Sequence, residues 1–504
     1  MKKIIVFLVV LLLGIFTSCK NSLSGKITIA DGKEPFTLNQ DMVSRLAALA
    51  VTGDCKLDEQ QVKDNVLSAL SALSENSNER AAVTVTDFSL SAPKVATLKA
   101  PASFGKTERS ANIQDFDEIN LYLYTTNEGK DNEGWILASN DRRVGTIIAV
   151  VDGKYSEDDE EENPFMDIFY AGLENHILET VYTWNSLTEE DIRAALTNTE
   201  IAESDDYYYN NWYIRDKKLL RMYKYCWNHE ASPFRSFIAN IYGGEYAAGC
   251  GPVALGQIFA LYAWPERCTT VQLAYLKQKC DDKKLNNWDG VYDWELLQRG
   301  YIMPFEDSSD ECQYEIKGER IAFRVNASAL MYDIGINCNA TYTPDATTVS
   351  SAGIKKALKH FGYLFDEEKK YDLKDIKQSI KNGYPVYING GHRYNKIGHA
   401  WVISGFANLS CDVYKKAGNV YITRLTDNFV YCNSGMGAGY NGYYLNGIFD
   451  LGRQMVDIYN MKEADADWYI REKIRLHERA ERPNPGQYYY RVSVQIITNI
   501  RPSY

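Results

Sequence analysis

The chain has 504 residues, of which 45% are hydrophobic, and its formal net charge is -12. A chain of this length and composition can bury the cores of about two to four domains, which excludes a fibrous or disordered protein. The acidic balance argues against a nucleic-acid partner, because binding to phosphates requires a basic surface.

The first residues predict export. Lys2 and Lys3 precede an apolar run, residues 4–16, that is too short to span a bilayer but suits the core of a secretory signal. We therefore interpret residues 1–18 as a signal peptide. The run leads into the sequence Phe-Thr-Ser-Cys, which resembles a bacterial lipoprotein box with Cys19 as the lipidated residue. The alternative is an ordinary signal peptide without lipidation. We expect a location in the bacterial cell envelope, periplasmic or on the cell surface, or secretion.

Residues 27–190 have the pattern of a small α+β unit. Apolar residues recur at helical spacing in residues 38–50, whereas residues 121–124 and 135–138 are typical of strands. Between them, residues 83–112 are rich in Ser, Thr, Ala, Lys and Pro and show little periodicity. This composition predicts a mobile linker or a long insertion.

A polar stretch, residues 186–216, predicts a domain boundary, and we assign residues 191–225 to a linker. Residues 226–504 show helical patterns first and strand patterns afterwards. The helical patterns follow Cys250 and recur at 292–298, 327–334 and 354–361, and the strand patterns are at 385–388, 400–404, 421–422, 429–432 and 488–498. This order predicts an α+β domain with a helical side, a sheet side and a cleft between them.

The cysteines carry no metal or redox signature. Apart from Cys19 and Cys250 there are eight, an even number that permits disulfides in an exported chain without revealing their connectivity. They are Cys55, Cys226, Cys268, Cys280, Cys312, Cys338, Cys411 and Cys432. No two cysteines have the Cys-x-x-Cys spacing, so we expect no structural metal and no cofactor.

Cys250 is placed where a helix would make a thiol nucleophilic. It follows Gly249 and precedes a long apolar stretch, in which Pro252 suits the first turn of a helix. Unpaired N–H groups and the macrodipole at a helix N-terminus lower the pKa of a thiol. For an isolated cysteine, burial as a small core residue is the more common explanation. The assignment therefore depends on partners elsewhere in the chain.

His399 and Asn433 are the candidate partners. A thiol nucleophile needs a base, and the base needs a group that orients it. His399 lies at the start of a short strand bounded by glycines, and Asn433 ends another strand before a glycine-rich turn. The side-chain carbonyl of Asn433 would accept a hydrogen bond from the imidazole. The alternatives are a structural histidine and an asparagine that only initiates a turn.

The order Cys250, His399, Asn433 resembles that of the papain clan, and the surrounding residues resemble the streptopain-like cysteine peptidases, which are secreted bacterial zymogens. The resemblance spans most of the chain apart from residues 83–112 and loops. It rests on Gly249-Cys250, Gln257-Ile258, Trp264-Pro265, Tyr292-Asp293-Trp294, residues 330–335, 355–363 and 398–402, a propeptide-like segment at 134–141, and Arg501-Pro502.

The resemblance implies a two-lobed papain-like peptidase domain at residues 226–504 and an inhibitory propeptide at residues 27–190. Activation cleavage would then occur within residues 191–225. It further implies that Cys250 attacks the peptide carbonyl, that His399 transfers the proton, and that Asn433 orients His399. The partners would be protein or peptide substrates and the chain's own propeptide as inhibitor.

Several residues depart from the family pattern. The family carries Trp-x-Gln before the nucleophile, and its Gln donates to the oxyanion, whereas this chain has Trp227 followed by Asn228 and His229. His229 or Asn228 would have to donate instead. Two family tryptophans are replaced by Ser434 and Met436, and Ser404 lies where the family often has an acidic residue.

Three functions therefore remain open. The first is an active cysteine endopeptidase made as a zymogen. The second, motivated by His229 and Ser434, is a catalytically weak or inactive relative that binds peptides or displays a surface on the envelope. The third is another thiol acyl transfer, transglutaminase-like or in bacteriocin-leader processing, because Cys-Gly-Pro also opens the nucleophile helix of leader peptidases. The propeptide-like segment favours the first.

Overall fold

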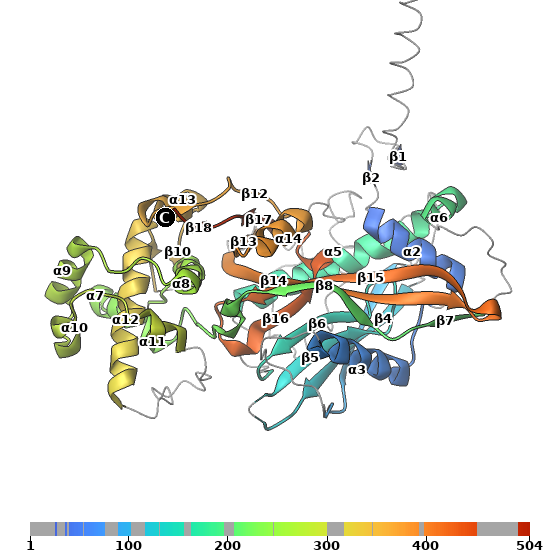
Figure 1. Cartoon of the computed structure of the whole chain (residues 1–504), viewed down its shortest axis with the longest axis horizontal. Helices are drawn as coiled ribbons and strands as arrows, with labels where there is room; N and C mark the ends of the chain where they lie inside the picture. Colours follow the sequence, from blue (N-terminus) through green and yellow to red (C-terminus); the bar gives the residue numbers. More distant parts are fainter. Residues whose placement is uncertain are drawn as a thin grey trace, which may run out of the picture.

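The computed structural model is a mixed α+β protein (Figure 1). It describes residues 26–27, 36–37, 40–53, 55–75, 89–101, 116–130, 132–155, 163–195, 206–244, 246–299, 317–344, 346–392, 398–450 and 492–503. The predicted signal peptide, Cys19 and Cys312 lie outside the described residues. Each described helix is too short or too polar to cross a lipid bilayer.

The elements fall into two groups along the chain. The first group comprises β1 (Lys26–Ile27), β2 (Phe36–Thr37), α2 (Gln40–Thr52), α3 (Glu59–Glu75), β3 (Lys94–Pro101), β4 (Phe116–Thr126), β5 (Gly134–Ser139), β6 (Ile147–Asp152), α5 (Pro164–Ser186) and α6 (Glu189–Ala195). We call residues 40–195 the N-terminal segment and residues 206–503 the C-terminal part.

The C-terminal part contains two strands, a helical region and then most of the remaining strands. In order these are β7 (Tyr207–Tyr209), β8 (Tyr213–Leu219), η1 (Arg221–Lys224), α7 (Ser232–Tyr242), α8 (Cys250–Tyr262), α9 (Thr270–Lys279), α10 (Lys283–Asn287), α11 (Trp294–Arg299), α12 (Lys317–Asn337), β9 (Thr341–Tyr342), β10 (Thr347–Thr348), α13 (Ser351–His360), β11 (Tyr363–Leu364), β12 (Lys369–Lys370), α14 (Leu373–Lys381), β13 (Val386–His392), β14 (Gly398–Lys415), η2 (Ala417–Asn419), β15 (Val420–Asn433), η3 (Ala438–Tyr440), β16 (Asn441–Leu445), η4 (Asn446–Ile448), β17 (Val492–Ile497) and β18 (Arg501–Pro502).

One antiparallel sheet of 12 strands joins the two groups. Its order is β12-β17-β13-β14-β15-β16-β6-β5-β4-β3, and β7 and β8 pair with β14. The junction is the pairing of β16 with β6, in which Tyr444 lies opposite Ala149. The α+β class that the sequence predicts is confirmed, but the N-terminal segment adds its strands to the sheet of the C-terminal part and does not fold as a separate layer.

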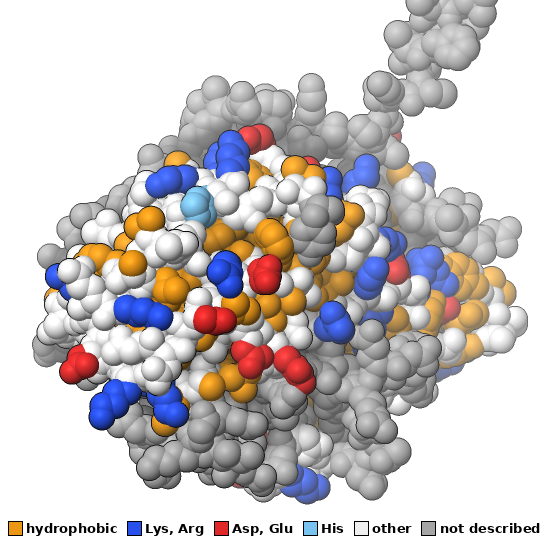
Figure 2. Space-filling view, turned by 60° about the vertical axis from the view of Figure 1, so that its left-hand side comes forward, with side chains coloured by type: hydrophobic (Ala, Val, Ile, Leu, Met, Phe, Trp, Pro, Cys, Tyr) orange, Lys and Arg blue, Asp and Glu red, His pale blue; other side chains and the backbone are white. Residues whose placement is uncertain are grey.

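Helices α7–α13 of the C-terminal part gather at the left of Figure 1, whereas β4 and β7 lie on the right. Helix α8 lies at the centre of this group of helices. Its side chains Val253, Leu255 and Phe259 are fully buried. Helix α12 packs against α8 and also against α7. Apolar side chains are scattered between charges on the outer face of this end (Figure 2). On this face Tyr242 is exposed, and its ring centroid lies 5.0 Å from that of Tyr342.

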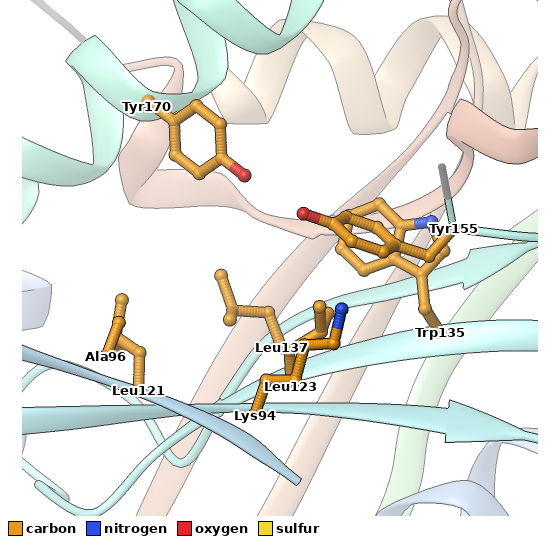
Figure 3. A pocket seen from close by; sticks show the side chains of 8 residues that line it. All are labelled: Lys94, Ala96, Leu121, Leu123, Trp135, Leu137, Tyr155 and Tyr170. Atoms are coloured by element: carbon orange, nitrogen blue, oxygen red, sulfur yellow. The ribbon is translucent and has the colours of Figure 1, made fainter. Parts of the chain in front are cut away.

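Part of the predicted linker or insertion at residues 83–112 is a regular strand. Strand β3 lies within this range and pairs with β4 from Lys94 opposite Leu123 to Pro101 opposite Phe116. The Ser- and Lys-rich composition hid a strand whose outer edge faces solvent, where polar residues are tolerated. With β4, β5 and α5, strand β3 lines a small pocket formed by Lys94, Ala96, Leu121, Leu123, Trp135, Leu137, Tyr155 and Tyr170 (Figure 3).

Strands β14 and β15 are longer than the sequence predicts. The patterns at 421–422 and 429–432 belong to one strand, β15, which forms a hairpin with β14. β13 pairs with β14 only up to Ile403, and β16 pairs with β15 only from Phe429 onwards. The hairpin continues beyond both partners as a projection, residues 408–428, which we call the arm.

Part of the predicted linker at residues 191–225 is ordered against this arm. Strand β8 pairs with β14 from Gly405 to Ser410, and β7 pairs with it from Val413 to Lys415. The sequence signal missed this because these strands are short and polar, and their pairing partner lies about 200 residues away in the chain. No disulfide joins any two of the eight described cysteines.

Candidate active site

Cys250 is the first residue of helix α8, as the sequence predicts. The preceding Gly249 has a φ of 94°, and a Cβ there would lie 2.7 Å from the Thr347 side chain, so only glycine suits this position. Pro252 is in the first turn, where its missing N–H costs no helical hydrogen bond. The tight turn therefore presents the thiol at the open N-terminus of the helix.

Strand β14 passes beside this helix end. Burial raises the pKa of the Cys250 thiol, while the backbone N–H groups of Ala400, Gly251 and Cys250 itself oppose that shift. Ala400 is the neighbour of His399, so the strand that carries the histidine reaches the sulfur. The N–H groups around the sulfur favour a thiolate, whereas the covered position of the sulfur disfavours it.

His399 has one engaged nitrogen and one free nitrogen. It is 2% exposed, its Nε2 lies 2.7 Å from the carbonyl oxygen of Ser434, and its Nδ1 has no hydrogen-bond partner. A carbonyl only accepts, so Nε2 carries the proton and Nδ1 holds the free lone pair. Burial lowers the pKa of His399 to about 4, although the Ser434 carbonyl opposes this shift. The imidazole is therefore a neutral base at pH 7.

The predicted contact between Asn433 and His399 is not made. Asn433 lies opposite Val402 in the β14–β15 register, and its side chain accepts from the Ser404 hydroxyl at 2.6 Å and donates to the Met222 carbonyl at 2.8 Å. Side chains alternate between the faces of a strand, so Asn433 shares a face with Val402 and not with His399. The group that orients His399 is the backbone carbonyl of Ser434, the residue that follows Asn433.

Asn441 is a site residue that the sequence analysis missed. Its side-chain oxygen accepts from the backbone N–H of Ser434 at 2.8 Å and from the Ser434 hydroxyl, while its amide donates to the Tyr225 carbonyl at 2.9 Å. These bonds fix the position of Ser434, the residue whose carbonyl accepts from His399. No local sequence signal marks Asn441, because its position depends on the pairing of β15 with β16.

The two candidate oxyanion donors have different surroundings. The ring centroid of His229 is 5.9 Å from that of His399, and its Nε2 lies 2.9 Å from the sulfur of Met436. Its carbonyl accepts from the backbone N–H of Ala248, which fixes the loop before Cys250. The Asn228 side chain accepts from the backbone N–H of Glu230 within a turn. The side chain of His229 therefore lies beside that of His399.

His229 is neutral as well. Burial and, to a smaller extent, the neighbouring His399 lower its pKa to about 3. A neutral imidazole still has one N–H to donate, so loss of the positive charge does not remove this candidate donor. Among the described residues, no group of three or more His, Cys, Asp or Glu side chains is arranged to hold a metal ion.

Helix α5 of the N-terminal segment covers the site. The ring of Phe165, in the first turn of α5, lies edge-on to His399 with 6.1 Å between ring centroids and edge-on to Trp401 with 5.4 Å. One turn of helix further on, Ile168 lies against Gly390 of β13, where a Cβ would be 3.1 Å from its side chain. The burial that shifts the pKa of His399 therefore comes in part from the N-terminal segment.

Comparison with known proteins identifies the C-terminal part. Residues 227–444 match the Peptidase C10 family, which confirms the predicted resemblance to streptopain-like peptidases for this part of the chain. No curated protein matches the chain.

Two solved structures from Prevotella intermedia are similar. A fragment of prointerpain A, carrying one substitution, is 16% identical, with coverage of 71% of this chain and 93% of that chain and a TM-score of 0.40. Active wild-type interpain A cysteine protease is 17% identical, with coverage of 46% and 87% and a TM-score of 0.29.

Proposed function

We propose that this chain, which carries a domain of the Peptidase C10 cysteine protease family, is an exported cysteine endopeptidase made as a zymogen. The observation that supports this most is the combination of a thiol at the start of α8 with a histidine on the adjoining strand whose Nδ1 has no other partner. The predicted signal peptide and the predicted lipidation at Cys19 support a location in the bacterial envelope or outside the cell.

The proposed reaction uses the free lone pair of His399. Nδ1 takes the proton of the Cys250 thiol, and the sulfur attacks the carbonyl carbon of the substrate. The oxyanion is stabilised by the backbone N–H of Cys250 and by His229. The proton then passes from His399 to the leaving amine as the C–N bond breaks. A water molecule, deprotonated by His399, releases the acyl group and restores the thiol.

In this proposal the backbone carbonyl of Ser434 orients His399, as the side chain of the third residue does in a catalytic triad. It holds the Nε2 proton and stabilises the imidazolium that forms during the reaction. Asn433 contributes indirectly, because its bonds to Ser404 and Met222 fix the end of β15. Asn441 fixes the Ser434 peptide from the other side.

This arrangement predicts different effects for two neighbouring side chains. Ser434→Ala retains the backbone carbonyl, so we expect kcat/KM on a peptide substrate within about threefold of wild type. Asn441→Ala leaves the buried N–H of Ser434 without its partner, and we expect a loss of about tenfold or more, mainly in kcat. Equal losses in both variants, or full activity of Asn441→Ala, would contradict the assigned roles.

The N-terminal segment is proposed to be the inhibitor, with activation cleavage within residues 191–225. In the structure Phe165 packs on His399, so a substrate cannot approach the site from the side of α5.

The second candidate function is a catalytically weak relative that binds peptides. The observation that favours it is the contact of His229 Nε2 with Met436, which engages one ring nitrogen of the side chain that would donate to the oxyanion beside the backbone N–H of Cys250. Loss of one such donor costs about a hundred- to a thousandfold in kcat.

Labelling with an epoxysuccinyl peptide separates the two functions. For the endopeptidase, we expect rapid and specific labelling of Cys250 at pH 7 once the N-terminal segment is removed. In the intact chain, burial raises the thiol pKa, so labelling should be slow and should accelerate as the pH rises above the usual range of a thiol. Mass spectrometry of the modified peptide measures both rates. No labelling of Cys250 after removal of the segment would support the second candidate.

A further inference from the structure

We propose that Met436 is an oxidation site within the candidate active site, and that hydrogen peroxide lowers catalysis by converting its thioether to a sulfoxide. The effect on catalysis rests on the proposed function, because it acts through His229, the proposed oxyanion donor. The modification itself follows from the contacts of Met436, which do not depend on any activity.

Met436 lies on the short loop that follows β15 and that also carries Ser434. Its backbone N–H donates to the Ser434 hydroxyl at 3.2 Å, and it forms an isolated β-bridge with Asn228. Beside this bridge, the backbone N–H of His229 donates to the Gly435 carbonyl at 3.1 Å. The loop and the segment that carries His229 are therefore fixed to each other through their backbones.

The sulfur of Met436 contacts the side chain of His229. Its Sδ lies 2.9 Å from Nε2, and Nδ1 of the same ring has no hydrogen-bond partner. A thioether sulfur can only accept, so Nε2 carries the proton and donates to the sulfur. Because the imidazole is neutral, this is its one N–H. Met436 and the oxyanion of the reaction therefore compete for the same N–H.

The thioether is the weaker of the two competitors. Sulfur is a weak acceptor, whereas an oxyanion is charged and forms a shorter and stronger hydrogen bond. The N–H can therefore leave Met436 as the tetrahedral intermediate forms. A sulfoxide is polar, and its oxygen would hold the N–H before the substrate reacts. In addition, the 2.9 Å between Sδ and Nε2 leaves no room for an added oxygen atom, so the ring or the loop must move.

Met436 is accessible to an oxidant. It is partly exposed, whereas Met166, Met222 and Met331 are at most 1% exposed. Among the described residues, the other partly exposed methionine is Met42, in α2 of the N-terminal segment. Because susceptibility to oxidation follows exposure, peroxide should select these two methionines over the buried ones. Met42 is therefore the matched control.

The oxidation transfers two electrons from the sulfur to the peroxide. A sulfur lone pair attacks one oxygen of hydrogen peroxide, so that the S–O bond forms as the O–O bond breaks. The leaving hydroxide takes the proton of the transferred hydroxyl and becomes water. A methionine sulfoxide reductase restores the thioether with two thiols, which become a disulfide while the oxygen leaves as water. The modification is therefore reversible.

The first test uses the full chain with Cys250→Ala, in which neither self-processing nor oxidation of the nucleophile interferes. After treatment with hydrogen peroxide and then catalase, mass spectrometry measures oxidation of each methionine, and NMR records the signals of isotope-labelled histidines. We expect Met436 to be oxidised about tenfold faster than Met222, or more. The His229 signal, identified by its loss in His229→Gln, should shift, while that of His360, at the end of α13, should not.

Two substitutions of Met436 separate the role of its sulfur from that of its volume. Met436→Leu conserves the volume without an acceptor, so peroxide should not move the His229 signal, whereas Met42→Leu should respond as the parent chain does. Met436→Gln places a polar acceptor near Nε2 and should shift the signal before any oxidant is added. Oxidation of Met436 no faster than that of Met222 would overturn the proposal. So would an unmoved His229 signal in a chain whose Met436 is fully oxidised.

The effect on catalysis is measured on the self-processed chain that retains Cys250. A reversible thiol reagent caps Cys250 during oxidation, and dithiothreitol then removes the cap but does not reduce the sulfoxide. We expect kcat for a peptide to fall by about a hundredfold with little change in KM, as for the loss of an oxyanion donor, and methionine sulfoxide reductase to restore it. If the chain hydrolyses no peptide before oxidation, the proposed function fails, while the NMR result still decides on Met436. An unchanged kcat with Met436 fully oxidised would overturn its inhibitory role.

Discussion

Replacing Cys250 by alanine is expected to abolish both self-processing and peptide hydrolysis. The proposed mechanism has no other route to an acyl intermediate, because the buried thiols Cys268 and Cys432 have strongly raised pKa values as a result of desolvation. Removing the nucleophile of a comparable catalytic group costs on the order of a millionfold in kcat. The measurement is the mass of the purified chain over time, together with hydrolysis of a fluorogenic peptide.

The matched control is Cys55→Ala. Cys55 is a partly buried cysteine of the N-terminal segment, far along the chain from the site. We expect this variant to process and to hydrolyse the peptide at the wild-type rate. If the Cys250→Ala chain is still cut at the same position when purified to homogeneity, cleavage comes from another enzyme or another nucleophile. The assignment of Cys250 would then fail.

The sequence could place Cys250 and His399 because each carries a local signal. Gly249 and Pro252 define a helix start around the cysteine, and the glycines that bound the strand of His399 set its entry into the sheet. Both signals act over a few residues, so no knowledge of the tertiary fold is required.

The partner of His399 could not be placed in the same way. Asn433 and Ser434 are adjacent, and which of them faces the imidazole depends on the pairing register and on the alternation of side chains in β15. A strand pattern does not reveal this register. The residue type also misled, because the group that accepts from His399 is a backbone carbonyl, which every residue possesses.

The interface between the two parts of the chain was outside the reach of sequence reasoning altogether. Arg45 and Asp427 are 382 residues apart, and neither lies in a motif. The polar composition of residues 207–219 predicted a linker, although these strands pair with the arm and extend the surface against which α3 packs. Long-range pairing overrides local propensity in such strands.

Replacing Arg45 by methionine is expected to destabilise the intact chain by about 3–5 kcal/mol at pH 7. Methionine fills most of the space but leaves the buried carboxylate of Asp427 without a counter-ion, which is the costly way to break a buried pair. Desolvation raises the pKa of Asp427 even with Arg45 present. Urea unfolding of the Cys250→Ala chain measures the effect, because no processing then interferes.

The pH dependence and two further variants identify the cause. Because the folded-state pKa of Asp427 lies above its unfolded value, the penalty of the lone carboxylate is complete above the folded pKa and disappears as protonation neutralises it. The defect of Arg45→Met should therefore shrink as the pH falls from 7 towards 4.

Adding Asp427→Asn should restore a large part of the loss at pH 7. Arg193→Met, which removes an exposed pair with Glu189 whose side chains are 76% and 88% exposed, should change stability by less than about 1 kcal/mol. An Arg45→Met defect as small as that of Arg193→Met would show that the buried pair does not hold α2 on the arm.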